Sequence, residues 1–390
     1  MSILSTLSIS SGPVYYVLAA VGVIVILYAI LKIAIGIVSI GSNEVGIIEK
    51  KWNLGKSLSN GDIIALNGEP GYQPNLLRTG LHFLYSPIMY RIAKFPLITV
   101  PQGKIGYVFA RGGEPLGTAQ TLGKEVNCNN FQDVKAFFQN GGQKGPQRAI
   151  LREGTYAINV SQFIVITEEK VYALDNLNEN EANAIEKTKN DLINCQGFNP
   201  VIIKSYVERN ERTNAEKIVE LMGLVTVKEG PSLPNGVIIA PTVADKVSDE
   251  NFHNNFQLPE KFLAAGGFKG LQHQVLTDGM YYINRLFADV IFDQKTIIEV
   301  GSVGVVNSYY GEKGIDISGD SFTHGELVEE GFKGIWNKAL APGKYAFNLQ
   351  AGEIIKVPTK NVIIKWNNVE NGDHRLDTDL KEVAYFYNLV

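Results

Sequence analysis

Two stretches of this chain, residues 129–159 and 254–284, align without a gap, and 15 of the 31 aligned positions are identical. The shared pattern begins N-N-F-Q, continues through G-G-x-K-G-x-Q, and ends in L-x-x-G-x-Y-x-I-N. Self-similarity of this kind is typical of chains built from tandem structural units. We therefore expect a repeat protein.

Two fainter copies keep the same spacings. One copy retains Gly334, Gly343, Tyr345 and Asn348. The other retains only Gly71, Leu77 and Gly80. Each of the four copies is preceded by a glycine in an apolar stretch: Gly46, Gly106, Gly223 and Gly304. The predicted signature residues are Gly145, Gly270, Gly334, Tyr156, Tyr281, Tyr345, Asn159, Asn284 and Asn348.

The residue types of one unit predict a small antiparallel β structure, because β-branched and aromatic residues favour strands while Gly, Asp and Asn favour turns. Each unit has a turn just before its last short strand. The predicted turn glycines, expected to adopt a positive φ, are Gly80, Gly154, Gly279 and Gly343. Pro342 presets the backbone before the fourth of them.

After each turn, residues two apart share one face of the strand, as Tyr156 and Ile158 do, and this face must be covered. A single repeat is too small to bury a large hydrophobic core by itself. Neighbouring units should therefore stack. The predicted fold class is mainly β with α elements (α+β), with the repeats stacked into an elongated rod.

The N-terminal region predicts a membrane anchor. Residues 13–31 contain no charged side chain, and as a helix they would extend about 28 Å, close to the roughly 30 Å of a bilayer core. Pro13 and Leu31 bound the segment, Tyr15 and Tyr16 suit one interface, and Lys32 follows it. A cleaved signal peptide is disfavoured because no Lys or Arg precedes Lys32.

The side of the membrane follows from nearby positive charge. No Lys or Arg lies before the predicted span, whereas Lys32, Lys50, Lys51 and Lys56 follow it. The positive-inside rule therefore places the repeat body in the cytoplasm. A periplasmic body is the alternative.

The chain divides into eight predicted segments. Residues 175–220 are expected to be helical, with Ala215, Ile218, Val219 and Met222 forming one apolar stripe. Residues 359–390 read as the start of a further unit that is interrupted. The segments are a tail (1–12), the anchor (13–40), repeat 1 (41–100), repeat 2 (101–174), the helical insertion (175–220), repeat 3 (221–298), repeat 4 (299–358) and the interrupted unit (359–390).

Several chemistries are disfavoured. A net charge of −4 without a long basic run argues against nucleic-acid binding. Cys128 and Cys195 form no C-x-x-C motif, and Gly55-Lys56-Ser57 lacks the upstream glycine of a phosphate-binding loop. Asp373, His374, Asp377 and Asp379 are the one cluster with metal-ligand chemistry, but they lack the glycine and glutamate of a calcium loop. No cofactor, metal or catalytic residue is predicted.

The stretch VSIGSNEVGIIEKKW, followed by LLRTGLHFLYSPIMYRI with Gly80, His82, Phe83 and Pro87, resembles the SPFH or band 7 superfamily of stomatins, prohibitins and flotillins. The tandem repeats resemble those of long flotillin-like bacterial members and the shoulder repeats of major vault proteins. The likeness extends from the anchor to residue 390. The further band 7 strands and the long coiled coil of such relatives do not follow here.

The resemblance implies a non-enzymatic scaffold of the bacterial inner membrane. Such a protein forms a homo-oligomeric ring or cage that encloses a membrane microdomain with partner membrane proteins such as proteases. A membrane-tethered periplasmic binding or adaptor protein built of small β modules is the alternative. A hydrolase is disfavoured, because the sequence shows no nucleophile with a base and an orienting acid.

Overall fold

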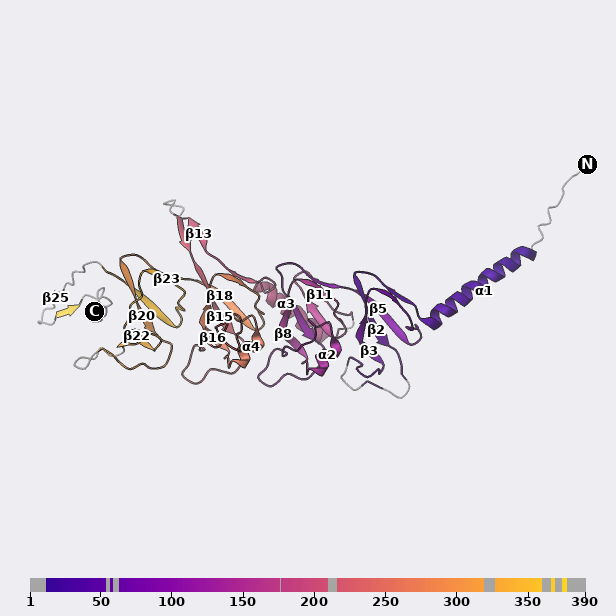
Figure 1. Cartoon of the computed structure of the whole chain (residues 1–390), viewed down its shortest axis with the longest axis horizontal. Coiled ribbons are helices and arrows are strands. Elements are labelled where there is room, and N and C mark those ends of the chain that lie inside the picture. Colours follow the sequence, from indigo (N-terminus) through magenta and orange to yellow (C-terminus); the bar gives the residue numbers. More distant parts are fainter. Residues whose placement is uncertain are drawn as a thin grey trace, which may run out of the picture. The chain divides into compact units, whose positions relative to one another are not determined.

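The computed structural model describes residues 12–53, 57–58, 63–175, 177–209, 216–318, 327–359, 366–368 and 374–376. The fold is mainly β and consists of small, mostly antiparallel sheets (Figure 1). It comprises two compact units: residues 1–116 with 123–193, and residues 117–122 with 194–390.

The first unit begins with helix α1, Gly12–Ile35. Pro13, Tyr15, Tyr16, Leu31 and Lys32 all lie along it, and Tyr16 is 79% exposed. Among the described residues, no helix combines the length and the apolar content that crossing a membrane requires. The anchor therefore stays a prediction.

The first repeat is a three-stranded sheet with a short extra ladder. Its central strand is β2 (Glu44–Lys50). The preceding strand, β1 (Val38–Ile40), pairs with β4 (Gly80–His82), which begins at the turn glycine. The sheet contains β3 (Gly71–Leu77), β2 (Glu44–Lys50) and β5 (Tyr90–Pro96), and the ladder contains β1 (Val38–Ile40) and β4 (Gly80–His82).

The second repeat has the same plan with one added edge strand and two helices. Its sheet is β11 (Val171–Tyr172), β10 (Phe163–Ile166), β7 (Gly106–Ala110) and β8 (Gly145–Leu151); its ladder is β6 (Ile98–Val100) with β9 (Gly154–Tyr156); its helices are α2 (Val134–Gln139) and α3 (Glu179–Asn194).

The second unit contains the third and fourth repeats. The third comprises β16 (Gly270–Leu276), β15 (Leu221–Val227), β18 (Ala288–Gln294), the ladder β12 (Val201–Ile203) with β17 (Gly279–Tyr281), and α4 (Pro259–Ala264). The fourth comprises β21 (Leu327–Val328), β22 (Gly334–Trp336), β20 (Ser302–Ser308), β24 (Gly352–Pro358) and the ladder β19 (Thr296–Ile298) with β23 (Gly343–Tyr345). A last pair, β25 (Trp366–Asn368) with β26 (His374–Leu376), follows.

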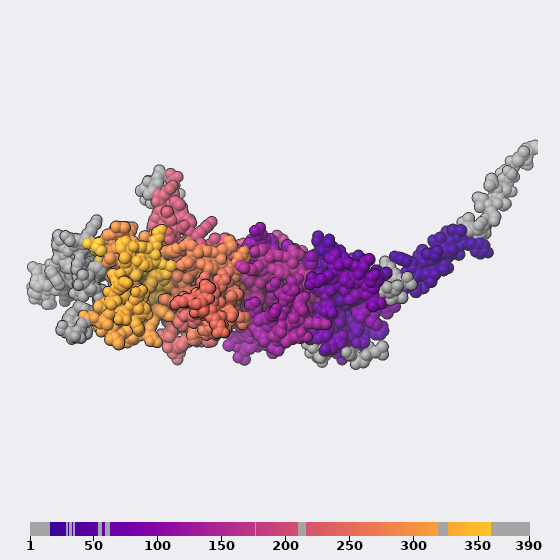
Figure 2. Space-filling view, viewed as in Figure 1, coloured from indigo at the N-terminus to yellow at the C-terminus, as the bar shows by residue number. Residues whose placement is uncertain are grey.

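One part of the predicted helical insertion is wrong. α3 is a helix, but the later segment forms a hairpin of β13 (Tyr206–Arg209) and β14 (Glu216–Val219), which stands out from the sheets of its unit (Figures 1 and 2). Val207 pairs with Ile218, and this β-branched pairing overrides the apolar spacing that predicted a helix. Met222 lies in β15, and Ala215 falls outside the described residues.

The N-N-F-Q motif forms a structure that the sequence analysis missed. Residues 129–131 have φ of 52°, 51° and 62°, and residues 254–256 have φ of 47°, 53° and 63°. Three successive left-handed residues are unusual, and the asparagines tolerate this conformation best. Each turn leads into a short helix, α2 or α4. Phe137 of α2 and Phe262 of α4 are buried in the cores of their repeats.

The helix phenylalanine is equivalent in the two cores, but its aromatic partner is not, because Phe163 aligns with Ala288 and Phe287 aligns with Gln162. Phe137 packs edge to face on Phe163 with ring centres 4.9 Å apart, and Phe262 packs on Phe287 at 5.9 Å. A Cβ placed on Gly142 would lie 2.5 Å from the Phe137 ring, and one on Gly267 would lie 2.3 Å from the Phe262 ring. The G-G pair of the repeat motif therefore makes room for a core phenylalanine.

Candidate functional site

Three of the four predicted turn glycines have the predicted backbone. Gly80, Gly154 and Gly279 have φ of +131°, +150° and +158°. Gly343 does not adopt a positive φ, so the expectation for it is wrong. Pro342 fixes its own φ just before this glycine, and no described residue of the fourth turn is left-handed.

The signature tyrosines close these turns. Each hydroxyl donates to the carbonyl oxygen four residues earlier, with O···O distances of 2.9 Å for Tyr156, 3.0 Å for Tyr281 and 2.8 Å for Tyr345. In the first repeat, Nε2 of His82 lies 2.6 Å from the Arg78 oxygen. Tyr281 is buried, whereas Tyr156 and Tyr345 are half-buried, so these side chains serve the turn as well as the covered face.

Signature glycines Gly145, Gly270 and Gly334 open β8, β16 and β22 with φ of 113°, 110° and 131°. In two of these strands the glutamine two residues further on folds back onto the glycine. The side-chain amide of Gln147 donates to the Gly145 oxygen at 2.8 Å, and that of Gln272 donates to the Gly270 oxygen at 2.8 Å.

The signature asparagines join successive repeats inside each unit. The amide of Asn159 donates to the backbone oxygen of Gln73 at 3.0 Å, and that of Asn348 donates to the oxygen of Gln272 at 3.0 Å. Asn159 and Asn348 are buried, at 0% and 3% exposure. Asn284 is likewise buried, and its Oδ1 accepts the backbone N–H of Leu286 at 2.9 Å. The asparagine is therefore an inter-repeat contact as well as a loop residue.

Each of the first three repeats also carries a side loop that hydrogen-bonds to the strand opened by its signature glycine. The backbone N–H of Ala65 donates to Tyr72, that of Gly123 to Pro146 and that of Ala240 to Leu271, at 2.8, 2.7 and 2.8 Å. The acceptors occupy equivalent positions in the three repeats, so the loops are equivalent too. We call residues 117–123 and 234–241 the second and third side loops.

The second side loop is held by a buried carboxylate. Glu229 is 3% exposed, and its Oε1 accepts the backbone N–H groups of Thr121 and Leu122 at 2.9 and 3.1 Å. These three residues belong to the second unit. Backbone N–H groups that converge on one carboxylate oxygen form strong, charge-assisted hydrogen bonds.

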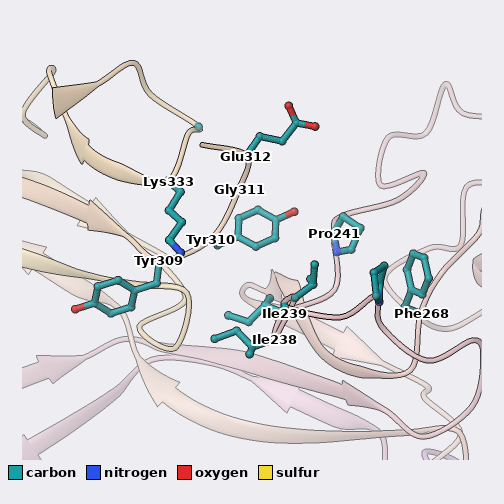
Figure 3. Close-up of a pocket in the computed structure, with 13 residues that line it drawn as sticks. Ile238, Ile239, Pro241, Phe268, Tyr309, Tyr310, Gly311, Glu312 and Lys333 are labelled. Atoms are coloured by element: carbon teal, nitrogen blue, oxygen red, sulfur yellow. The ribbon is translucent and has the colours of Figure 1, made fainter. Parts of the chain in front are cut away.

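The third side loop borders an open pocket of about 490 Å³ in the same unit (Figure 3). Tyr310 lies on the wall of this pocket. It stands six residues after Gly304, just as Glu229 stands six residues after Gly223 in the preceding repeat. The wall is mostly apolar and aromatic, with one cation and one carboxylate. Its principal residues are Ile238, Ile239, Phe268, Tyr309, Tyr310 and Lys333.

Tyr310, on the wall of this pocket, is held in place by stacking. The ring of Tyr310 lies parallel to the His273 ring, with centres 4.1 Å apart and an angle of 14° between the planes. Nδ1 of His273 is 3.3 Å from the Thr242 hydroxyl. Burial lowers the pKa of His273 and raises the pKa of Tyr310, so both rings are neutral near pH 7.

A charged cluster holds the turn of the third repeat. Lys295 is paired with Asp278 at 2.5 Å and with Glu220 at 3.5 Å, and Lys344 also contacts Glu220. Hydrogen bonds from lysine lower the pKa of both carboxylates, and the hydrogen bond to Asp278 raises the pKa of Lys295. Asp278 and Lys344 are more than half exposed, whereas the side chains of Lys295 and Glu220 are only 11% and 16% exposed, so the cluster is a structural group at the surface.

The described residues contain no group of three or more His, Cys, Asp or Glu side chains that could hold a metal ion. Asp373, Asp377 and Asp379 lie outside the described residues, and His374 lies in β26. Cys128 is buried and Cys195 is half-buried, and no disulfide joins them.

No protein-family model matches the chain, and no curated protein matches it in sequence. The SPFH resemblance rests on the residues quoted from the sequence.

Proposed function

We propose that this chain is a non-enzymatic membrane scaffold of the SPFH type. It anchors in the bacterial inner membrane through its N-terminal segment and stacks its repeats into an elongated rod. Copies of the chain assemble into a ring or cage around a membrane microdomain and organise partner membrane proteins, membrane proteases among them.

One observation carries the proposal: buried asparagine amides join successive repeats within a unit. Asn159 reaches the strand of the first repeat, and Asn348 reaches the strand of the third. A repeat that depends on its neighbour for buried hydrogen bonds belongs to an array whose stability comes from stacking. An array suits the wall of a large assembly better than it suits a catalytic domain.

The anchor is supported by α1. The first turn of this 24-residue helix contains no acidic residue. Side chains along the helix, such as Val17, Ile24 and Tyr28, are more than half exposed. A long row of exposed apolar side chains needs a nonpolar environment. The excess of lysine after the helix favours a cytoplasmic body.

The test is the size of the full-length protein extracted in mild detergent. We expect a species of megadalton scale on a size-exclusion column with light scattering, and closed rings or cages in electron micrographs. A monodisperse monomer at micromolar concentration would contradict the scaffold.

The pocket of the second unit favours one second candidate, the membrane-tethered periplasmic binding or adaptor protein. A phosphatase reporter fused after residue 60 distinguishes the two. Phosphatase activity at this position places the body in the periplasm and supports the adaptor, whereas its absence supports the cytoplasmic scaffold.

A further inference from the structure

The second and third side loops are equivalent in backbone but differ in what their N–H groups contact. In the second loop, the N–H groups of Thr121 and Leu122 bind Oε1 of Glu229. The equivalent residues of the third loop are Ile238 and Ile239, because each pair directly precedes the residue that hydrogen-bonds to the signature strand.

Among the described residues, the N–H groups of Ile238 and Ile239 have no hydrogen-bond acceptor. Ile239 is only 2% exposed, and a buried N–H without a partner is costly. The position that supplies Glu229 to the second loop holds Tyr310 beside the third. Tyr310 instead stacks on His273, and the space beside the loop stays open as the 490 Å³ pocket.

The rest of the pocket complements an anion with an apolar body. Figure 3 shows the Lys333 side chain directed toward Tyr310 and the Glu312 carboxylate directed away from it. Ile238 is 71% exposed and Tyr309 is 46% exposed, and both line the pocket with Phe268. The donors therefore sit next to an apolar and aromatic wall.

We propose that this pocket binds a small amphipathic carboxylate, such as a fatty or aryl acid. Its carboxylate accepts the N–H groups of Ile238 and Ile239, in the manner of Glu229 on the second loop, and is neutralised by Lys333. Its alkyl or aryl body lies against Ile238, Phe268 and Tyr309. The site is independent of the scaffold function, because its contacts lie within one chain.

The equivalent cavity of the first unit does not suit such a ligand. It lies beside Gly112, measures about 160 Å³, and has the Glu69 carboxylate in its wall. A carboxylate already present in so small a space repels a second one. The proposal is therefore specific to the third side loop.

The test uses full-length protein in mild detergent and 4-phenylbutanoate, a soluble carboxylate with an aryl body, followed by saturation-transfer NMR. We expect saturable binding, and we expect the matched 4-phenylbutanamide to bind at least about tenfold more weakly because it lacks the charge that the donors recognise. Equal binding of the acid and the amide would overturn the proposal.

Two variants locate the site. Tyr310→Glu places a carboxylate where Glu229 stands in the preceding repeat, so it should abolish binding of 4-phenylbutanoate. Lys333→Gln, at an exposed position, should weaken binding about tenfold. Val247→Asp is the matched control, because Val247 is 84% exposed and lies outside the pocket lining. Unchanged binding in both pocket variants would refute the site.

A polypeptide carboxylate is the competing occupant. The peptide acetyl-Leu-Glu-Leu-amide tests it in competition with 4-phenylbutanoate. Weaker binding of the peptide supports the small-molecule proposal, and tighter binding overturns it in favour of an acidic segment of another protein.

Discussion

The second and third repeats share the N-N-F-Q turn, the short helix and the core phenylalanine, yet they differ in the residue that caps the turn. His253 Nδ1 accepts the backbone N–H of Phe256 at 2.9 Å, and the Cys128 side chain makes the equivalent hydrogen bond with the Phe131 backbone. Imidazole and thiol thus serve one backbone geometry. The turn is specified by the motif and by the aromatic packing, and the capping atom is replaceable.

The side loops of these two repeats differ more. Glu229 satisfies the second loop, whereas the third loop faces an open pocket. The shared residues therefore lie where the repeats need the same backbone, and the larger difference lies at the side loops, where Glu229 and Tyr310 occupy equivalent positions. Four changes test this division.

The largest effect should come from the shared core. Phe137→Ala and Phe262→Ala each remove a ring that is at most 1% exposed, so each should lower the free energy of unfolding by about 3–5 kcal/mol. The measurement is denaturant unfolding of the full-length protein in detergent, with Ile315→Ala, at an 85% exposed position, as the control. Costs that differ more than twofold between the two sites would show that the cores are not equivalent.

The next effect concerns the side loops. Glu229→Ala leaves the N–H groups of Thr121 and Leu122 without their acceptor and should cost about 1–3 kcal/mol. Glu229→Gln keeps an oxygen acceptor and should cost less. The same unfolding assay measures both, and hydrogen exchange at the two amides should accelerate in the alanine variant. Slow exchange there in the alanine variant would mean that Glu229 does not hold the loop.

The repeat plan was predictable because it rests on local residue chemistry. Spacing alone located Gly154 and Gly279 in turns and predicted four small antiparallel units. The inter-repeat contact of Asn159 was not predictable, because its partner lies 86 residues away at Gln73. The β13–β14 hairpin was missed for a different reason, because the apolar spacing favoured a helix and the β-branched pairing of Val207 with Ile218 overrides it.

The sequence contains a signal for the side loops, one of which borders the pocket. The letters I-I-A occur at residues 63–65 and again at residues 238–240, and the second side loop has Thr121-Leu122-Gly123 in their place. Aligning these loops would have indicated one more equivalent segment in each of the first three repeats. The difference between Glu229 and Tyr310 acquires meaning only when the hydrogen bonds to the loop are known.

The turn glycines offer a smaller and better matched comparison. A Cβ on Gly154 or on Gly343 would lie 3.3 Å from the ring of the tyrosine two residues later, but only Gly154 has a positive φ. Gly154→Ala should therefore cost about 1 kcal/mol more than Gly343→Ala, because only the first adds backbone strain. Thermal unfolding of both variants measures the difference, and equal costs would show that φ is unimportant here.

The smallest effect separates the two capping residues by their response to pH. Burial lowers the pKa of His253, although its hydrogen bond to the Val243 carbonyl opposes the shift. The unfolded chain takes up this proton near the usual histidine pKa of about 6.5, while the folded chain takes it up only at lower pH. Stability should therefore fall as pH drops below about 6.5 and level off below the folded pKa.

His253→Cys gives the third repeat the cap of the second and should remove this part of the acid slope. His273, whose pKa burial also lowers, remains in both proteins and supplies the same residual slope. Unfolding free energies at several values between pH 5 and pH 7.5 measure the difference between the two proteins. A variant with the full slope of the parent would place its origin elsewhere, whereas a flatter profile would show that two repeats with one backbone respond differently to acid through a single capping atom.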